Sequence, residues 1–292
     1  MYARPEMERI LKVFAWSAGF VLFLGVASCS SQHGAAEQKI PSDEIKATNM
    51  KETKSMPKQD EDSAKKELME GMVARRTQTP IDGALVHYQE FPSELIRPRP
   101  VDVWLPEGYD PASSDRYPVI YMHDGQFMFH QSRSPFAGMD LFWDVDKAIT
   151  RLVRDGEIRP AIVVSVWMAQ WKKGARGAEY MPQKAVTDEV WQLMKEQGQS
   201  FAVEEGGEEI TSDDYLKFLV DELKPFIDET YATRSDRDNT FVIGSSMGGL
   251  ISAYAIAEYP DVFGGAACLS SHWPIADGIV VQWLNHHWPS AG

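Results

Sequence analysis

The chain has 292 residues, of which 43% are hydrophobic, so it is long and apolar enough to form a large globular domain. Its 43 acidic and 29 basic residues give a formal net charge of -14. Because nucleic-acid binding needs clustered lysine and arginine, this charge argues against a nucleic-acid partner, and we interpret the acidity as a source of solubility.

The first 29 residues have the pattern of an export signal. Basic residues precede a short apolar run over residues 13–26, and small residues then lead to Cys29. The run is short for a membrane-spanning helix. Val-Ala-Ser-Cys resembles the bacterial lipobox, which implies a lipoprotein signal peptide, lipidation of Cys29 and an anchor in the bacterial cell envelope, at the outer membrane facing the periplasm. The alternative is an uncleaved N-terminal anchor in which Cys29 is incidental.

Residues 30–78 are predicted to be a disordered polar tether, because they are rich in charged and polar residues and cannot bury enough apolar surface to fold. The folded domain is expected over residues 79–292. Cys268 lies in a run of small apolar residues and is predicted to be a buried, unreactive thiol. Two cysteines, one of them in the signal, do not indicate a disulfide framework.

The hydrophobic pattern of the domain alternates between strands and helices. Apolar segments predict strands at residues 84–91, 101–105, 117–122, 160–167, 239–243 and 263–269. Helices are predicted at residues 141–153, 212–223 and 248–258, the second capped by Ser212 and kinked or ended by Pro225. The inner strands are apolar on both faces, so we expect an α/β fold with a mostly parallel sheet and helices on both faces.

Residues 168–211 fit no regular element and contain an acidic run. An insertion of this length in a compact domain is often a lid or a substrate-binding loop, and we predict a lid-like insertion. The alternative is a solvated excursion without function.

The chemistry-bearing motif is Gly-Ser-Ser-Met-Gly at residues 244–248, which matches the G-x-S-x-G pattern of a nucleophile elbow. Such an elbow places a serine hydroxyl on a sharp strand-to-helix turn, where glycines avoid steric clashes. An apolar strand before the motif and a helix after it favour Ser246 as a nucleophile, with the Met247 N–H as the first oxyanion donor. The alternatives are an incidental serine in a glycine-rich turn, or Ser245, which is not at the centre of the motif.

The sequence resembles the "putative esterase" branch of the α/β-hydrolases, which includes esterase D-like and enterochelin esterase-like enzymes. The matching stretches are residues 101–106, 121–126, 244–250 and 258–264. The resemblance implies an α/β-hydrolase fold and a second oxyanion N–H from Gln126, which lies in His-Asp-Gly-Gln. We expect His123 and Asp124 to order this loop by hydrogen bonding, since triad partners normally follow the nucleophile in this fold.

The order expected in this family is serine, acid and then histidine. We expect the acid and histidine beyond residue 292, in which case the chain is truncated, the last strands of the sheet are missing and this chain lacks its base and acid. The alternative inside the chain pairs Asp277 with His286 or His287. We expect His272 and Trp273 to be substrate-proximal, with Asp124 a further candidate. Neither carboxylate nor cysteine lies at ligand spacing from the histidine pair, so no metal site is predicted.

Together these features predict a serine carboxylic-ester hydrolase of the cell envelope that works through an acyl-enzyme on Ser246 and needs no cofactor. Its expected partners are a small-molecule or carbohydrate ester and, through Cys29, the membrane. Two alternatives stay open: an acyltransferase on the same scaffold, and a non-catalytic glycan-binding lipoprotein.

Overall fold

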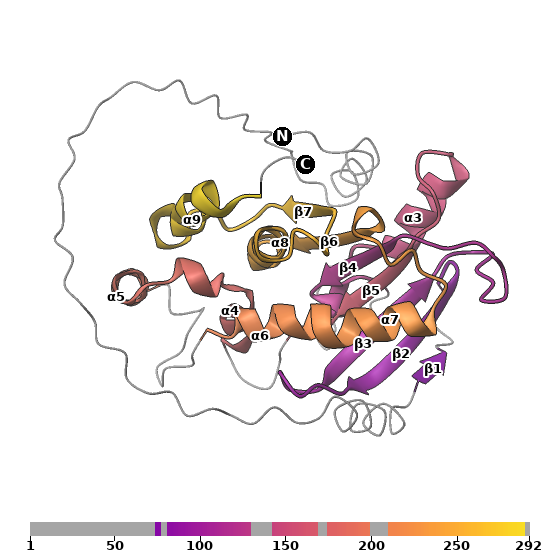
Figure 1. Ribbon diagram of the computed structural model, residues 1–292, viewed down its shortest axis with the longest axis horizontal. Coiled ribbons are helices and arrows are strands. Elements are labelled where there is room, and N and C mark those ends of the chain that lie inside the picture. The colour runs from indigo at the N-terminus through magenta and orange to yellow at the C-terminus, as the bar shows by residue number, and fades with distance from the viewer. Residues whose placement is uncertain (1–73, 77–80, 130–141, 169–173, 199–209, 290–292) are drawn as a thin grey trace. The chain divides into compact units, whose positions relative to one another are not determined.

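The computed structural model of the protein describes residues 74–76, 81–129, 142–168, 174–198 and 210–289 (Figure 1). The predicted signal peptide with Cys29 and most of the predicted tether lie outside these residues. Residues 74–76 are an exception, because they form β1 (Ala74–Arg76) and pair with Val86–Tyr88, so the prediction of a tether up to residue 78 was wrong there. A strand can be added by backbone hydrogen bonds alone, which the polar composition does not reveal.

The strands that follow confirm all six predicted strand segments. They are β2 (Ala84–Phe91), β3 (Arg99–Leu105), β4 (Val119–His123), β5 (Ile162–Val166), β6 (Thr240–Ser245) and β7 (Gly265–Leu269). Within the described residues they form one sheet in the order β1-β2-β3-β5-β4-β6-β7. β4 is parallel to both β5 and β6, and β6 is parallel to β7. β3 is antiparallel to β2 and to β5, so β2 runs in the direction of β4 to β7 and the sheet is mixed and mostly parallel.

The helices follow the alternation that the sequence predicts. They are α3 (Val145–Arg154), α4 (Ala175–Tyr180), α5 (Asp188–Glu196), α6 (Ser212–Lys217), α7 (Lys224–Thr230), α8 (Met247–Glu258) and α9 (Ile279–His287), with the short turns η1 (Gly125–Phe127), η3 (Gln183–Ala185), η6 (Arg237–Asn239) and η7 (Ile275–Gly278). No helix in the described part of the chain is long and apolar enough to cross a membrane.

The helix predicted to begin at Ser212 differs from the prediction at both ends. Thr211 is its N-cap residue, and the Ser212 hydroxyl instead accepts a hydrogen bond from the Gln183 N–H at 2.9 Å. Pro225 does not end the helix, because a π-helical segment, η5 (Phe218–Leu223), precedes it and α7 continues to Thr230. A proline lacks an N–H and clashes with the carbonyl four residues earlier, and it is tolerated near the start of a helical segment.

The expectation that residues 168–211 hold no regular element was also wrong for their middle part. α4, η3 and α5 form there, and Ala178, Tyr180 and Met181 are buried. Residues 169–173 and 199–209 of this segment lie outside the described residues, and the lid-like role expected for residues 168–211 stays a prediction. The described part of this segment is therefore a component of the packed domain rather than a solvated excursion.

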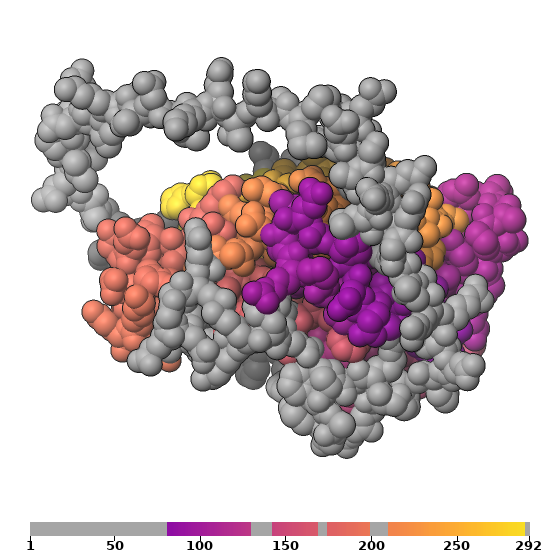
Figure 2. All heavy atoms as spheres, turned by 90° about the horizontal axis from the view of Figure 1, so that it is seen from below, coloured from indigo at the N-terminus to yellow at the C-terminus, as the bar shows by residue number. Residues whose placement is uncertain are grey.

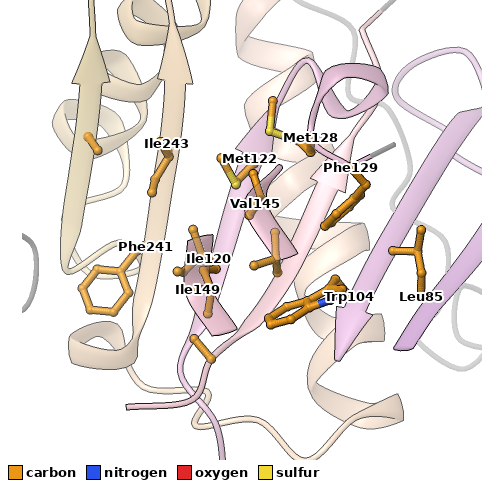
Figure 3. Close-up of a cluster of buried hydrophobic side chains, with 13 residues drawn as sticks. Leu85, Trp104, Ile120, Met122, Met128, Phe129, Val145, Ile149, Phe241 and Ile243 are labelled. Carbon is orange, nitrogen blue, oxygen red and sulfur yellow. The ribbon is translucent and has the colours of Figure 1, made fainter. Parts of the chain in front are cut away.

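Apolar side chains cover both faces of the sheet. Successive side chains of a strand point to opposite faces. On one face a buried cluster joins the central strands to α3 (Figure 3), and its members include Leu85, Trp104, Ile120, Met122, Val145, Ile149, Val163 and Ile243. On the other face the Phe226 ring of α7 contacts the rings of Tyr88 and Phe91 of β2, with centroids 5.4 and 5.2 Å apart. The continuous rod of α6 and α7 in Figure 1 therefore packs across the N-terminal strands.

The surface seen from below in Figure 2 includes residues of the N-terminal strands, in indigo, and of the α4–α5 segment, in salmon. In β2, Gln89 and Glu90 are both exposed between the buried Tyr88 and Phe91, at the bulge where the pairing of β2 with β3 shifts register.

A buried ion pair connects the sheet to the α4 segment. Arg99 of β3 donates from Nη1 and Nη2 to the two carboxylate oxygens of Glu179 at 2.7 and 2.6 Å, and both side chains are at most 3% exposed. The Arg99 guanidinium also lies over the Tyr215 ring of α6, 5.7 Å from its centroid. Separating these two buried side chains would leave an uncompensated charge away from water, which is strongly unfavourable. The pair therefore holds α4 against β3 and α6.

Candidate active site

The residues singled out by the sequence meet at the carboxyl ends of the parallel strands. β4 lies between β5 on one side and β6 on the other, and it is parallel to both. The chain passes from β4 to β5 on one side and then from β5 to β6 on the other side, so the strand order reverses at β4. Ligands of open α/β sheets bind beyond the carboxyl ends of the strands at such a point. The His-Asp-Gly-Gln turn lies at the end of β4 and the Gly-Ser-Ser-Met-Gly turn at the end of β6, so both motifs lie at the carboxyl ends of neighbouring parallel strands.

Ser246 has the backbone geometry of a strained elbow. It joins β6 to α8 with φ 59° and ψ -119°, a region that residues other than glycine rarely adopt, and the residue is exposed. Its N–H donates to the Leu269 carbonyl of β7 at 3.0 Å. Its carbonyl accepts from the Gly249 N–H at 3.1 Å and the His272 N–H at 3.2 Å. These three hydrogen bonds fix the serine on the tip of the turn.

The two glycines of the motif lie at close contacts, Gly244 against backbone atoms and Gly248 against side chains of the neighbouring elements. A Cβ added to Gly244 would collide with the carbonyl of Gly248, so the strand and the first turn of α8 can approach only without a side chain at this position. A Cβ added to Gly248 would lie 3.2 Å from the Asp124 Oδ2, which places the Asp124 carboxylate against the same turn. The spacing of the motif therefore follows from the packing of β6, α8 and the turn after β4.

The backbone N–H groups of Met247 and Gln126, which the sequence analysis predicts as oxyanion donors, both lie at the starts of helical segments. Met247 is the first residue of α8, and Gln126 is the middle residue of η1, so both stand in first helical turns whose N–H groups have no partner within their helix. The Gln126 side chain accepts from the Met168 N–H at 3.1 Å. A Cβ on Gly125 would lie 2.8 Å from the Ser165 carbonyl oxygen. The η1 turn is therefore held against the end of β5.

His123 is buried and orders the loop after β4. Its Nδ1 lies 2.8 Å from the Tyr215 hydroxyl of α6, and its ring lies beside those of Tyr180 and Tyr215. Burial, reinforced by the charge of Arg176, lowers the pKa of His123 to about 3. The imidazole therefore stays neutral at physiological pH, as a loop-ordering group rather than one that titrates during a reaction.

Asp124 is bound by an arginine that the sequence analysis did not single out. Arg176 of α4 donates from Nε and Nη2 to the two Asp124 carboxylate oxygens, at 2.6 and 2.7 Å. Burial acts to lower the pKa of Arg176, but the Asp124 carboxylate outweighs it and raises that pKa. Both carboxylate oxygens thus bond the guanidinium, which is the loop-ordering role expected from the sequence.

The segment after β7 also reaches the elbow. Ser270 has φ 41°, and the chain then turns so that the His272 N–H bonds the Ser246 carbonyl. The Ser271 carbonyl accepts from the Trp273 N–H at 2.8 Å, and the His272 carbonyl accepts from the Ile275 N–H at 3.2 Å. His272 and Trp273 therefore belong to a tight turn that is hydrogen-bonded to the backbone of Ser246.

The alternative acid and histidine have other partners. The Asp277 carboxylate accepts from Gln197 Nε2 of α5 at 3.2 Å. The His287 ring stacks on Trp283, with centroids 4.2 Å apart, and its Nδ1 donates to the Trp283 carbonyl at 2.8 Å. His286 is exposed on the same helix, α9. Among the described residues, no three His, Cys, Asp or Glu side chains come together as a metal-binding group.

Cys268 of β7 is partly covered, and burial raises the pKa of its thiol to about 12. A thiol with this pKa carries almost no thiolate at neutral pH, so it is a poor nucleophile.

The sequence gives no signal for a set of side chains that pack against the turn after β4, next to Ser246. Arg176, Tyr180 and Tyr215 contact His123 or Asp124, and Arg176 Nη2 also lies 3.5 Å from the Ser245 carbonyl. Arg176 and Asp124 are 52 positions apart in the chain. A pair at this separation leaves no local periodicity, so a single sequence carries no signal for it.

The comparisons place the chain in a family. The esterase family model, described as "Putative esterase", matches residues 93–289, and the chain belongs to this family. An endo-1,4-beta-xylanase/feruloyl esterase of Xylanibacter ruminicola is 26% identical over 174 residues, which are 58% of this chain and 19% of that protein. An uncharacterized protein of Bacillus subtilis is 25% identical over 203 residues, 70% of this chain and 67% of its own length.

A solved structure, the siderophore hydrolase EstA from Aspergillus nidulans, superposes with a TM-score of 0.52 at 15% identity, covering 74% of this chain and 66% of that one. At this identity the likeness shows the fold. The fold is therefore α/β, with a mixed, mostly parallel sheet flanked by helices, and it matches esterase structures.

The buried His123 predicts a specific dependence of stability on pH. Its pKa is about 3 in the folded chain and close to 6.5 when unfolded, so below pH 6.5 the unfolded chain binds a proton that the folded chain does not. Stability is lost as the pH falls from 6.5 towards 3. Between pH 7 and pH 5 we expect the wild-type free energy of unfolding to fall by about 2 kcal/mol more than that of His123→Asn, measured by urea denaturation.

Tyr180, Tyr215 and Arg176, which surround the imidazole, are present in both proteins and so cancel in this comparison. His286→Asn, on an exposed position, is the control and should keep the wild-type dependence. Equal pH dependence of wild type and His123→Asn would show that the imidazole is not held neutral.

Proposed function

We propose that this member of the esterase family is a serine carboxylic-ester hydrolase and that Ser246 is its nucleophile. The observation that carries the proposal is the exposed Ser246 on a strained strand-to-helix turn, with φ 59° and ψ -119°. Such strain is retained where the surrounding structure enforces it, and it concentrates at functional sites. Family membership supports the same chemistry.

In the proposed reaction, the Ser246 Oγ attacks the ester carbonyl carbon while a histidine base takes the hydroxyl proton. The carbonyl oxygen becomes an oxyanion, which the Met247 and Gln126 N–H groups stabilise. Collapse breaks the bond to the alcohol, which leaves with the proton from the histidine. Water then attacks the acyl-enzyme, releases the carboxylic acid and restores the serine.

We propose that the base is a histidine that follows Ser246 in sequence, as the family order of serine, acid and histidine implies. The His123 ring bonds Tyr215, and the His287 ring bonds the backbone of its own helix. His272 is joined to Ser246 through its backbone, which supports a place for His272 and Trp273 at the substrate-facing rim. To identify the base, each of these histidines is replaced by asparagine in turn. The rates of fluorophosphonate labelling are then compared between variants with the same folded fraction.

The proposed substrates are esters of small molecules or carbohydrates. The Xylanibacter ruminicola relative is named a feruloyl esterase, and the structural neighbour EstA a siderophore hydrolase. These names favour a panel that contains feruloyl-sugar esters and siderophore esters. A fold does not fix the substrate, so hydrolysis rates over this panel decide between them.

Replacement of Ser246 by alanine should abolish hydrolysis of an activated aryl ester and labelling by a fluorophosphonate. We expect a loss of roughly 10³-fold or more, because the residual rate comes only from the oxyanion hole and binding. Ser245→Ala is the matched control, since it removes a hydroxyl from the adjacent residue and should retain most of the activity. Labelling that survives Ser246→Ala, or ester hydrolysis that Ser246→Ala leaves unchanged, contradicts the proposal.

We also propose that the protein is held in the bacterial cell envelope by a lipid on Cys29, facing the periplasm from the outer membrane. The support is the basic, apolar and small-residue order of residues 1–29. When the chain is expressed in a bacterium with an alkyne-tagged fatty acid, we expect wild type and Cys268→Ala to incorporate the tag and to sediment with membranes. Cys29→Ala should lose both properties. Equal sedimentation of Cys29→Ala would overturn the proposal.

A further inference from the structure

The Asp124–Arg176 pair joins the two turns that carry the proposed oxyanion donors. Arg176 binds both carboxylate oxygens of Asp124, and its Nη2 also lies 3.5 Å from the Ser245 carbonyl, one residue before the proposed nucleophile. One guanidinium therefore connects the turn after β4 to the end of β6.

The carboxylate itself lies between the two donor segments. Asp124 begins the η1 turn in a left-handed conformation, φ 59° and ψ 43°, and its carbonyl accepts from the Phe127 N–H at 3.0 Å. Its Oδ2 lies 3.2 Å from the place where a Cβ would stand on Gly248. A shift of this side chain would therefore change the separation between the Gln126 N–H, in η1, and the Met247 N–H, in the first turn of α8.

Arg176 is held rigidly enough to set this separation. Its guanidinium lies over the Tyr180 ring, 5.0 Å from the centroid, and the Tyr180 hydroxyl accepts from the Asp124 N–H at 3.2 Å. Both the side chain and the backbone of Asp124 thus bond to α4. A planar guanidinium that makes two parallel bonds fixes direction as well as distance, which an ammonium group does not.

The charge of Arg176 matters as much as its geometry. The Asp124 side chain is only 10% exposed, and a carboxylate in this position would repel the negative charge that develops on the ester oxygen. The bidentate arginine neutralises it. Without Arg176, the carboxylate would be left poorly solvated beside a site that must accept a second negative charge.

We propose that Arg176 is a positioning residue of this site: through Asp124 it fixes the spacing of the Gln126 and Met247 N–H groups and cancels a carboxylate charge that would oppose the oxyanion. The inference rests on the proposed function of Ser246. It adds a residue of α4, which touches neither substrate nor nucleophile hydroxyl, to the groups that determine the rate.

The test compares Arg176→Lys, Arg176→Gln and the double variant Asp124→Asn/Arg176→Gln on one neutral aryl ester. We expect kcat to fall about 10-fold in Arg176→Lys and about 100-fold or more in Arg176→Gln, with KM within about 3-fold of wild type, as for loss of an oxyanion donor. The double variant should regain about 10-fold over Arg176→Gln, because it removes the uncompensated charge. Affinity for a boronic acid that mimics the tetrahedral intermediate should fall in parallel with kcat.

Arg151→Gln, an exposed position on α3, is the control and should keep wild-type kinetics. Unfolding midpoints of all variants identify any that do not fold, and Arg176→Lys and the double variant then carry the test. A kcat for Arg176→Gln within about 3-fold of wild type, a change in KM alone, or a double variant no faster than Arg176→Gln overturns the inference. Ser246→Ala, assayed alongside, separates these outcomes from failure of the proposed function, which would leave wild type and Ser246→Ala equal.

Discussion

The backbone of Ser246 is the constraint on which the site depends. A non-glycine residue with φ 59° and ψ -119° costs about 1–3 kcal/mol, and it persists only where neighbours enforce it. Three hydrogen bonds supply that enforcement: the Ser246 N–H donates to the Leu269 carbonyl, and the Ser246 carbonyl accepts from the N–H groups of Gly249 and His272. They require β7 to pair with β6 in the observed register, Ser245 opposite Leu269, and α8 to approach β6 through Gly244. Strand pairing, helix packing and the turn after β7 thus converge on one residue.

Polar pairs on the α4 and α6 side of the sheet support the turn that carries Ser246. His123 bonds Tyr215, Asp124 bonds Arg176, and Arg99 bonds Glu179, so that β3, β4, α4 and α6 are tied together by directional contacts. Apolar packing is tolerant of small shifts, whereas a satisfied polar network in a low-dielectric interior specifies a single arrangement. The hydrophobic cluster on the opposite face of the sheet, shown in Figure 3, holds α3 and contributes burial rather than direction.

The sequence predicted the parts whose signal is local. The strands were predicted because runs such as Ile162–Val166 are apolar on both faces, and the strand-to-helix turn at Ser246 because the glycine spacing reflects backbone crowding. It missed α4 and its contacts, because Arg176 and Glu179 acquire their roles only from partners 52 and 80 residues away. It also missed β1, where backbone pairing suffices, and the π-helical segment that lets the helix pass Pro225. Features that depend on neighbouring residues could thus be predicted from the sequence, whereas polar pairs between distant residues could not.

Direct observation of the acyl-enzyme tests the central claim, that this turn presents Ser246 as a nucleophile. The protein would be mixed with excess p-nitrophenyl ester, quenched in acid within milliseconds to seconds, and digested for mass spectrometry. We expect one added acyl group, located on Ser246 and absent from Ser245 in the same peptide. Ester turnover without acylation of Ser246, or an acyl group on another residue, would contradict it.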